Sequence, residues 1–284
     1  MKIRKASALA AAVLALSLTA TACGSDDDSG DNGAGSGGGG EEAQTLTIGI
    51  KFDQPGLGLK TEDGTFTGFD VDVATYVAKE LGVDAENIEF KESPSPEREN
   101  MLSRGDVDFI VATYSITDER KEKVSFAGPY FLAHQDLLIR ADDSVGSVEE
   151  INDLTLCSVS GSTSAQNMKE NLAPDADLSE FNTYSECLSG LESGVVDALT
   201  TDDAILAGYA AQEQYAGKFK LAGLSLSDEN YGIGIPKGDT ELQADINAAL
   251  EKMVEDGSWE QFVEKNFGPS GYEYEPAPEI TETS

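Results

Sequence analysis

Residues 105–120 place several groups that can bind a carboxylate just after one strand. Residues 107–112 form a short apolar, β-branched run, which predicts a buried strand of an α/β sheet. Threonine is favoured at a helix N-cap, so Thr117 is expected to begin a helix, and Arg120 lies in the turn that follows. Open α/β sheets bind ligands at the carboxyl ends of their strands, where hydroxyls, a helix N-terminus and a guanidinium suit an acid group. The residues expected to hold that acid group are Thr113, Ser115 and Arg120.

A second copy of this pattern lies downstream, at residues 194–202. Both copies read Gly-x-Val-Asp followed by apolar residues, and the same number of residues separates Asp108 from Thr113 as Asp197 from Asp202. Two similar lobes are implied. If their strand ends face each other across a cleft, one lobe offers the positive charge of Arg120 and the other the negative charge of Asp202. A zwitterion such as an α-amino acid needs that pair.

The first residues have the composition of an export signal. A basic start precedes an apolar run over residues 6–20, which is too short to span a bilayer and ends at a small-residue cleavage site before Cys23. This pattern indicates a lipoprotein signal over residues 1–22, with Cys23 as the lipidated first residue of the mature chain. An ordinary secretory signal stays possible, because Ala20 stands where leucine is usual. Residues 23–44 are rich in Gly, Ser and Asp and are expected to be a disordered tether.

Composition indicates an exported globular protein that does not bind nucleic acid. The 284 residues are 39% hydrophobic, with alternating strand and helix patterns typical of α/β structure. The formal net charge of −34 argues against nucleic acid as a partner. No cofactor is predicted. The Pro- and Glu-rich residues 269–284 are expected to be a disordered tail.

Cys157 and Cys187 are an even pair in a chain that carries an export signal, which predicts a disulfide. Closing that loop would stabilise the second lobe by roughly 3 to 4 kcal/mol in the chain-entropy model. A metal or redox role is less favoured, because the spacing is not that of a short chelating motif and the only histidine, His134, lies elsewhere.

Five sequence runs in order resemble the polar amino-acid branch of the solute-binding proteins that feed ABC importers. The resemblance covers roughly residues 45–268, and its runs are residues 68–73, 115–121, 126–130, 201–204 and 257–259. It implies a two-lobed α/β fold, the type II periplasmic-binding-protein fold, with two hinge crossovers near residues 134–140 and 226–234. The first lobe would comprise residues 45–136 and 231–268, and the second residues 138–226. From the residues alone, 125–130 and 136–139 are expected as two separate strands.

The resemblance also assigns roles at the ligand. Arg120 would clamp the α-carboxylate, assisted by Thr113, Ser115 and Thr163, and Asp202 would stay ionised and take the α-ammonium. The simpler alternatives are that Arg120 is an exposed helix residue and that Asp202 is an N-cap, although Asp203 is the better N-cap candidate.

Basic residues near the expected pocket favour an acidic ligand side chain. Arg98 aligns with an arginine of glutamate/aspartate binders, and Lys51 follows the first strand, where binders of other amino acids tend to carry acidic or uncharged groups. Ser95 and Tyr184 fall at neighbouring side-chain positions. Two buried cations are costly unless an anion arrives, so glutamate or aspartate is expected, with glutamine as the alternative. The alternative for Lys51 and Arg98 is that both reach into water.

These assignments describe a binding protein held at the outer face of the cytoplasmic membrane through its lipid, with an ABC permease and its ATPase as partners. Without lipidation the protein would be secreted or periplasmic. The first rival is an enzyme on the same scaffold, such as a dehydratase or lytic transglycosylase, for which no catalytic glutamate is found. The second is a sensor or adhesin domain, which would need a transmembrane path for its signal.

Overall fold

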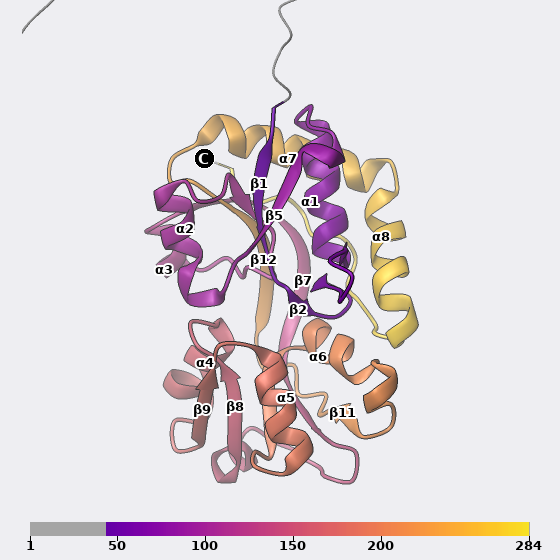
Figure 1. Cartoon of the computed structure of the whole chain (residues 1–284). Coiled ribbons are helices and arrows are strands. Elements are labelled where there is room, and N and C mark those ends of the chain that lie inside the picture. The colour runs from indigo at the N-terminus through magenta and orange to yellow at the C-terminus, as the bar shows by residue number, and fades with distance from the viewer. Residues whose placement is uncertain (1–43, 284) are drawn as a thin grey trace, which may run out of the picture. The chain divides into compact units, whose positions relative to one another are not determined.

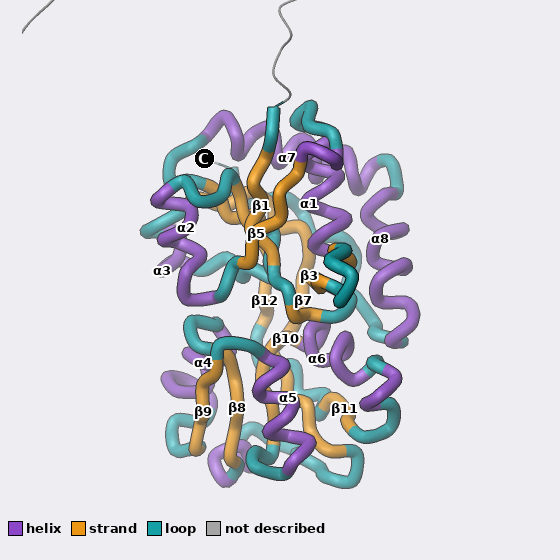
Figure 2. Tube along the Cα trace, in the orientation of Figure 1, coloured by secondary structure: helices purple, strands orange, loops and turns teal. Residues whose placement is uncertain are grey.

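The computed structural model describes residues 44–283, which form a mixed α/β fold (Figures 1 and 2). The predicted signal peptide, the lipidation site Cys23 and the tether up to residue 43 lie outside the described residues. Among the described residues no helix is both long and apolar enough to cross a bilayer.

Lobe 1 is built on three parallel strands, β5 (Ile88–Glu92), β1 (Leu46–Ile50) and β6 (Phe109–Ile110), in that order. The apolar faces of α1 (Phe69–Glu80), α7 (Thr240–Glu255) and α8 (Ser258–Phe267) enclose the lobe's core. Aromatic rings dominate its centre, and the Nε1 of Trp259 donates to the Tyr130 carbonyl at 2.8 Å. The smaller elements of this lobe are β2 (Asp53–Gln54), β3 (Gly58–Lys60), β4 (Phe66–Thr67), α2 (Arg98–Arg104) and α3 (Asp118–Lys121).

Lobe 2 repeats this plan with β8 (Thr155–Val159), β9 (Asp177–Phe181) and β10 (Ala198–Asp202), which pair in parallel around β8. Its other elements are α4 (Thr163–Asn167), α5 (Tyr184–Ser193), α6 (Asp203–Ala210) and β11 (Phe219–Leu221). The predicted disulfide is confirmed: Cys157 on β8 bonds Cys187 on α5, with a Cα–Cα distance of 5.5 Å. It fastens the helix that opens with Tyr184 to the centre of the lobe's sheet.

The two sequence repeats make the same hydrogen bond in the two lobes. Asp108 Oδ2 accepts a hydrogen bond from the backbone N–H of Thr47 at 2.7 Å, and Asp197 Oδ2 accepts one from that of Thr155 at 2.9 Å. Each aspartate thereby secures the start of its lobe's first strand. The glycines that open the repeats each follow a helix in the left-handed region: Gly105 at φ 70° and Gly194 at φ 75°.

Two long strands join the lobes, β7 (Ser125–Arg140) and β12 (Asp228–Ile235). β7 pairs with β12 over residues 125–134 and then with β10 over residues 135–139. The expectation of two separate strands, 125–130 and 136–139, is therefore wrong. Gly128 and Pro129 look like a turn in sequence, but a register shift between Tyr231 and Ile233 of β12 absorbs the irregularity and the ladder continues.

The C-terminal residues differ from the expected disordered tail. The backbone N–H groups of Thr281 and Glu282 both donate to the Gly128 carbonyl at 3.0 Å, and Asn247 Nδ2 donates to the Glu282 carbonyl at 2.8 Å. Scattered apolar side chains among the Pro and Glu residues pack on the core of lobe 1: Tyr272, Ala277 and Ile280. The composition suggested disorder, but these few side chains and backbone bonds hold the segment in place.

Candidate functional site

The carboxyl ends of β6 and β10 approach each other between the lobes, where a small cavity of about 10 Å³ lies. That is the space of about one water molecule, so an amino acid can enter only when the lobes separate. Seven of the nine predicted ligand-binding residues line this cavity. The full lining is Ser95, Arg98, Thr113, Arg120, Ser162, Thr163, Tyr184, Asp202 and Ile205.

The other two predicted residues lie beside the cavity. Ser115 Oγ is 3.4 Å from Thr163 Oγ1, so these two hydroxyls meet across the gap between the lobes. Lys51 Nζ lies 6.0 Å from the centre of the Tyr184 ring. The structure thus brings all nine residues to one place.

Arg120 is fixed by the start of α3. Thr117 is the N-cap, and its Oγ1 accepts from the Arg120 backbone N–H at 3.2 Å. The guanidinium donates to the Ser115 carbonyl at 2.7 Å and, across the lobes, to the Gly161 carbonyl at 3.1 Å. Arg120 is only 8% exposed, so it is not the surface residue that the simpler alternative supposed.

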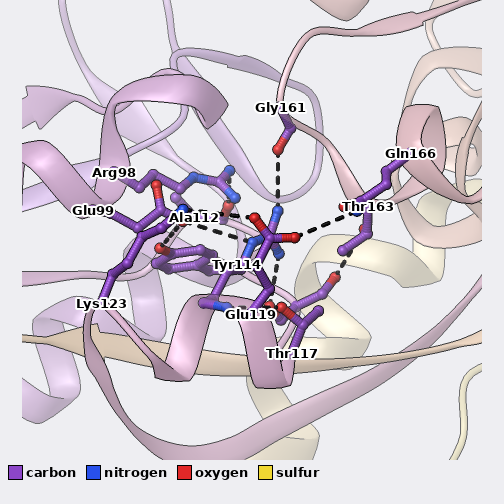
Figure 3. Close-up of polar contacts among 12 residues, drawn as sticks. Arg98, Glu99, Ala112, Tyr114, Thr117, Glu119, Lys123, Gly161, Thr163 and Gln166 are labelled. Atoms are coloured by element: carbon purple, nitrogen blue, oxygen red, sulfur yellow. Dashed lines mark hydrogen bonds and ion pairs between the residues drawn. The ribbon is translucent and has the colours of Figure 1, made fainter.

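Arg98 and Arg120 both lie close to the ring of Tyr114. The guanidinium carbon of Arg98 lies 4.7 Å from the centre of the Tyr114 ring (Figure 3). That of Arg120 lies 5.0 Å from the same centre. The Tyr114 hydroxyl donates to Glu99, whose carboxylate lies 3.8 Å from Arg120 Nε. Arg98 is 2% exposed; it donates to the Ala112 carbonyl, and its Nε is buried with no hydrogen-bond partner among residues 44–283. Burial, and then the charge of Arg120, lowers the pKa of Arg98, as expected for a buried cation beside a second cation.

Asp202 is the last residue of β10 and is buried. Tyr231 donates its hydroxyl to Oδ2 at 2.6 Å, and Ser164 donates to Oδ1 at 3.2 Å. Burial, and then the neighbouring Glu229, raises the pKa of Asp202 above the usual range of a carboxyl. Burial therefore works against the expected ionised form of Asp202, and a cation beside the carboxylate would favour that form.

The N-cap assignment also changes. Asp202 itself holds the N-cap position of α6, although its carboxylate makes no capping bond. Asp203, expected as the cap, accepts instead from the backbone N–H groups of Ala204 and His134.

Lys51 is 3% exposed, so it does not reach into water. Burial, and then the charge of Arg98, lowers its pKa to about 7. Among the described residues it has no ion-pair partner within 4.0 Å. Burial, followed by the charge of Asp202, raises the pKa of the neighbouring Tyr184 hydroxyl.

Lobe 2 contributes the start of α4. Ser162 is the N-cap and accepts from the Ala165 backbone N–H at 3.0 Å. Thr163, the first helical residue, donates to Glu229 Oε2 at 2.9 Å. Sequence reasoning missed Ser162 and Ile205 as lining residues, although Ser162 lies directly before the predicted Thr163.

Two further missed residues hold Thr113 in place. Asp70 Oδ2 accepts from the Thr113 backbone N–H at 2.9 Å, and Gln54 Oε1 lies 3.2 Å from the Thr113 hydroxyl. Thr113 has a φ of 47°, a left-handed conformation that these contacts help to impose. Burial raises the pKa of Asp70 to about 6. A signal was available, because Asp70 stands on the apolar face of α1 with Val73 and Val77.

The chain is similar to known amino-acid-binding proteins. Residues 46–269 match the family model of the bacterial extracellular solute-binding proteins, family 3. The glutamate-binding protein GluB of Corynebacterium efficiens is 48% identical over 238 residues, covering 80% of each chain. The glutamine-binding protein GlnH of Bacillus subtilis is 42% identical, covering 78% of this chain and 80% of the relative.

Solved structures show the same fold. An ancestral arginine-binding protein bound to glutamine superposes with a TM-score of 0.73 at 39% identity, covering 79% of this chain and 98% of the other. The ancestral amino acid-binding protein AncCDT-1, a precursor of cyclohexadienyl dehydratase, gives 0.70 at 34% identity, covering 78% and 95%. The two-lobed fold and the resemblance in the sequence are confirmed, and this chain belongs to the bacterial extracellular solute-binding proteins, family 3.

Proposed function

We propose that the protein captures glutamate, or aspartate, and delivers it to an ABC importer. The observation that carries the proposal is that Arg98, Arg120 and Asp202 line one buried cavity. Two guanidinium groups and one carboxylate complement a ligand that has two carboxylates and one ammonium. The similarity to proteins named glutamate-binding supports the same ligand.

The ligand's backbone would lie between the lobes. Arg120 pairs with the α-carboxylate, and Asp202 with the α-ammonium. The hydroxyls of Thr113, Ser115 and Thr163 complete the hydrogen bonds. In this arrangement the ammonium favours the ionised form of Asp202, which offsets the effect of its burial.

The ligand's second carboxylate would lie beside Arg98 and Lys51, with Ser95 and Tyr184 at the sides. Both cations are buried, and leaving them without an anion costs free energy. An acidic side chain supplies that anion, whereas an amide supplies only hydrogen bonds.

Glutamine is the second candidate. Burial lowers the pKa of Lys51 to about 7, so near neutral pH this side chain is uncharged in a large fraction of the molecules. An uncharged lysine needs no anionic partner. Similarity to a protein named glutamine-binding and to a structure bound to glutamine also supports this candidate.

Titration calorimetry with glutamate, aspartate and glutamine tests the assignment. Glutamate is expected to bind most tightly. In Arg98→Met, which keeps the length of the side chain but not its charge, glutamate and glutamine are expected to bind with equal affinity. An unaltered preference for glutamate in Arg98→Met, or tighter binding of glutamine by the wild type, would contradict the proposal.

We propose binding without catalysis, although AncCDT-1 is named as a precursor of an enzyme. Asp202, the carboxylate that lines the cavity, is held by Tyr231 and Ser164 where an ammonium is expected. Proton NMR of glutamate and glutamine after prolonged incubation with the protein should show no new resonances, and product signals would identify an enzyme.

The family implies two partners, a permease and an ATPase, to which the protein would deliver its ligand. Anchoring through a lipid on Cys23 is part of the proposal. Cys23→Ala is expected to release the protein from the membrane fraction into the medium, and unchanged membrane association would rule out that anchor.

A further inference from the structure

The lobes also contact each other away from the cavity, between the loop at β2 in lobe 1 and helices α5 and α6 in lobe 2. Tyr209 on α6 donates its hydroxyl to Asp53, with distances of 2.5 Å to the backbone carbonyl and 3.1 Å to Oδ2. Ser185 on α5 donates to the same carboxylate at 3.4 Å. Tyr209 is 2% exposed and Asp53 is half-buried, so the contact lies partly buried between the lobes.

Beside this contact the two backbones come unusually close. A Cβ built on Gly208 of α6 would lie 2.1 Å from the Pro55 carbonyl oxygen. Real Cβ atoms do not come that close to backbone, so any larger residue at position 208 requires helix α6 and the loop at Pro55 to move apart. Gly208 is helical, so its glycine is needed here for the close approach and not for an unusual backbone conformation.

None of Asp53, Pro55, Gly208 and Tyr209 lines the cavity. The charge of Asp53 also favours the protonated form of Lys51, whereas Gly208 and Tyr209 act on the ligand only through the position of the lobes. If the closed form holds the ligand more tightly than the open form, the apparent dissociation constant rises as the fraction of molecules that close falls.

We propose that Asp53, Pro55, Gly208 and Tyr209 form a closure contact that sets ligand affinity from outside the pocket. The absence of a side chain at Gly208 lets the lobes close, and the Tyr209–Asp53 bonds stabilise the closed form. The inference rests on the proposed binding function but not on which amino acid is bound.

Gly208→Ala tests the steric part. The substitution favours helix α6 and touches no cavity residue, so lobe 2 should keep its fold. Binding is expected to weaken at least about tenfold, equally for glutamate and glutamine, because the closed fraction falls for both. Gly190→Ala is the matched control: it lies in α5, its Cβ would be 3.5 Å from Val196 of the same lobe, and its affinity should not change.

Small-angle scattering without ligand separates this inference from the proposed function. Gly208→Ala is expected to have a larger radius of gyration than the wild type and Gly190→Ala. If the wild type binds none of the amino acids, the proposed function fails while the scattering result still decides on the contact. Wild-type dimensions in Gly208→Ala, or wild-type affinity for a ligand that the wild type binds, would overturn the inference.

Tyr209→Phe tests the bonded part without adding bulk, and keeps the inference testable if Gly208→Ala does not fold. Loss of both hydrogen bonds is expected to weaken binding about threefold, through faster dissociation and not slower association. Tyr215→Phe is the control, since its hydroxyl makes no hydrogen bond within residues 44–283. Equal dissociation rates in Tyr209→Phe and the wild type would show that these hydrogen bonds do not stabilise the closed form.

Discussion

Arg98 and Arg120 flank one tyrosine ring at close range, an arrangement that costs free energy until an anion binds. Tyr114 and Glu99 lessen that cost, because the ring face attracts both guanidinium groups and the carboxylate lies 3.8 Å from Arg120. The site is therefore preorganised for an anionic group before any ligand arrives.

Arg120→Ala should remove the main partner of the ligand's α-carboxylate. We expect a loss of roughly 3 to 5 kcal/mol in binding free energy, measured by titration calorimetry, because a buried carboxylate would be left unpaired. Lys123→Ala, which removes an exposed cation that follows α3, should bind like the wild type. Wild-type affinity in Arg120→Ala would end the assignment of the clamp.

The selectivity for glutamate over glutamine should fall as the pH rises. Lys51 has a pKa of about 7 in the protein without ligand, and a carboxylate beside it would raise that pKa. Binding of glutamate then takes up a proton, so the ratio of the two affinities should decrease by up to about tenfold per pH unit above pH 7. Asp202 affects both ligands alike, since both carry the ammonium, and it cancels in the ratio.

Calorimetry from pH 6 to pH 9 measures this ratio, and Lys51→Met should make it independent of pH. A ratio that stays constant in the wild type would show that Lys51 does not pair with the ligand. The same shift makes the free energy of unfolding depend on pH, because the pKa of Lys51 is about 7 in the folded protein and 10.5 in the unfolded chain. As the pH falls from 10.5 to about 7, the unfolded chain binds a proton that the folded protein does not, so the folded protein becomes less stable.

At the scale of elements, the site depends on where strands end and helices begin. β6 leads to Thr113, β10 ends at Asp202, and α3, α4 and α5 begin near Arg120, Thr163 and Tyr184. The paired aspartates of the two repeats fix the strands, and the disulfide fixes α5 on β8.

Replacing both cysteines, as in Cys157→Ser with Cys187→Ser, should lower the free energy of unfolding by roughly 3 to 4 kcal/mol. The bond closes a loop over a sequence separation of 30, and its loss frees the unfolded chain of lobe 2. Urea unfolding of both proteins gives the difference, with the reduced wild type as control. Equal midpoints for the oxidised wild type and the double variant would contradict a stabilising role.

At the scale of the whole molecule, the net charge of −34 opposes the approach of an anion. The outer opening of the cleft between the lobes also carries more negative than positive charges. Its lining contains four glutamates and three cations. The cations inside the site act only at short range, because the screening length at physiological salt is about 8 Å.

Salt should therefore speed the association of glutamate. Raising the ionic strength from about 0.01 M to about 0.15 M shortens the screening length from about 30 Å to about 8 Å. We expect the association rate of glutamate to rise roughly threefold and that of glutamine, which has no net charge, to stay constant in stopped-flow fluorescence. A rate for glutamate that falls with salt would mean that the cations of the site also steer the ligand from a distance.

Patterns within single strands and helices could be predicted from the sequence. The Gly-x-Val-Asp repeats, the hydroxyls after residues 107–112, Arg120 near a helix start and the two cysteines pointed to two lobes and a site for a zwitterion. These features are local, because apolar periodicity and capping residues record which face of an element is buried.

Only the tertiary structure decided what surrounds each charge. It made β7 one strand, laid the C-terminal segment on lobe 1, buried Lys51 beside Arg98, raised the pKa of Asp202 and brought Gly208 against Pro55. These outcomes depend on contacts between segments that lie far apart in the chain, and on the water that those contacts exclude. The order of residues fixes the elements and their end groups, whereas packing fixes the dielectric surroundings and the distances on which binding depends.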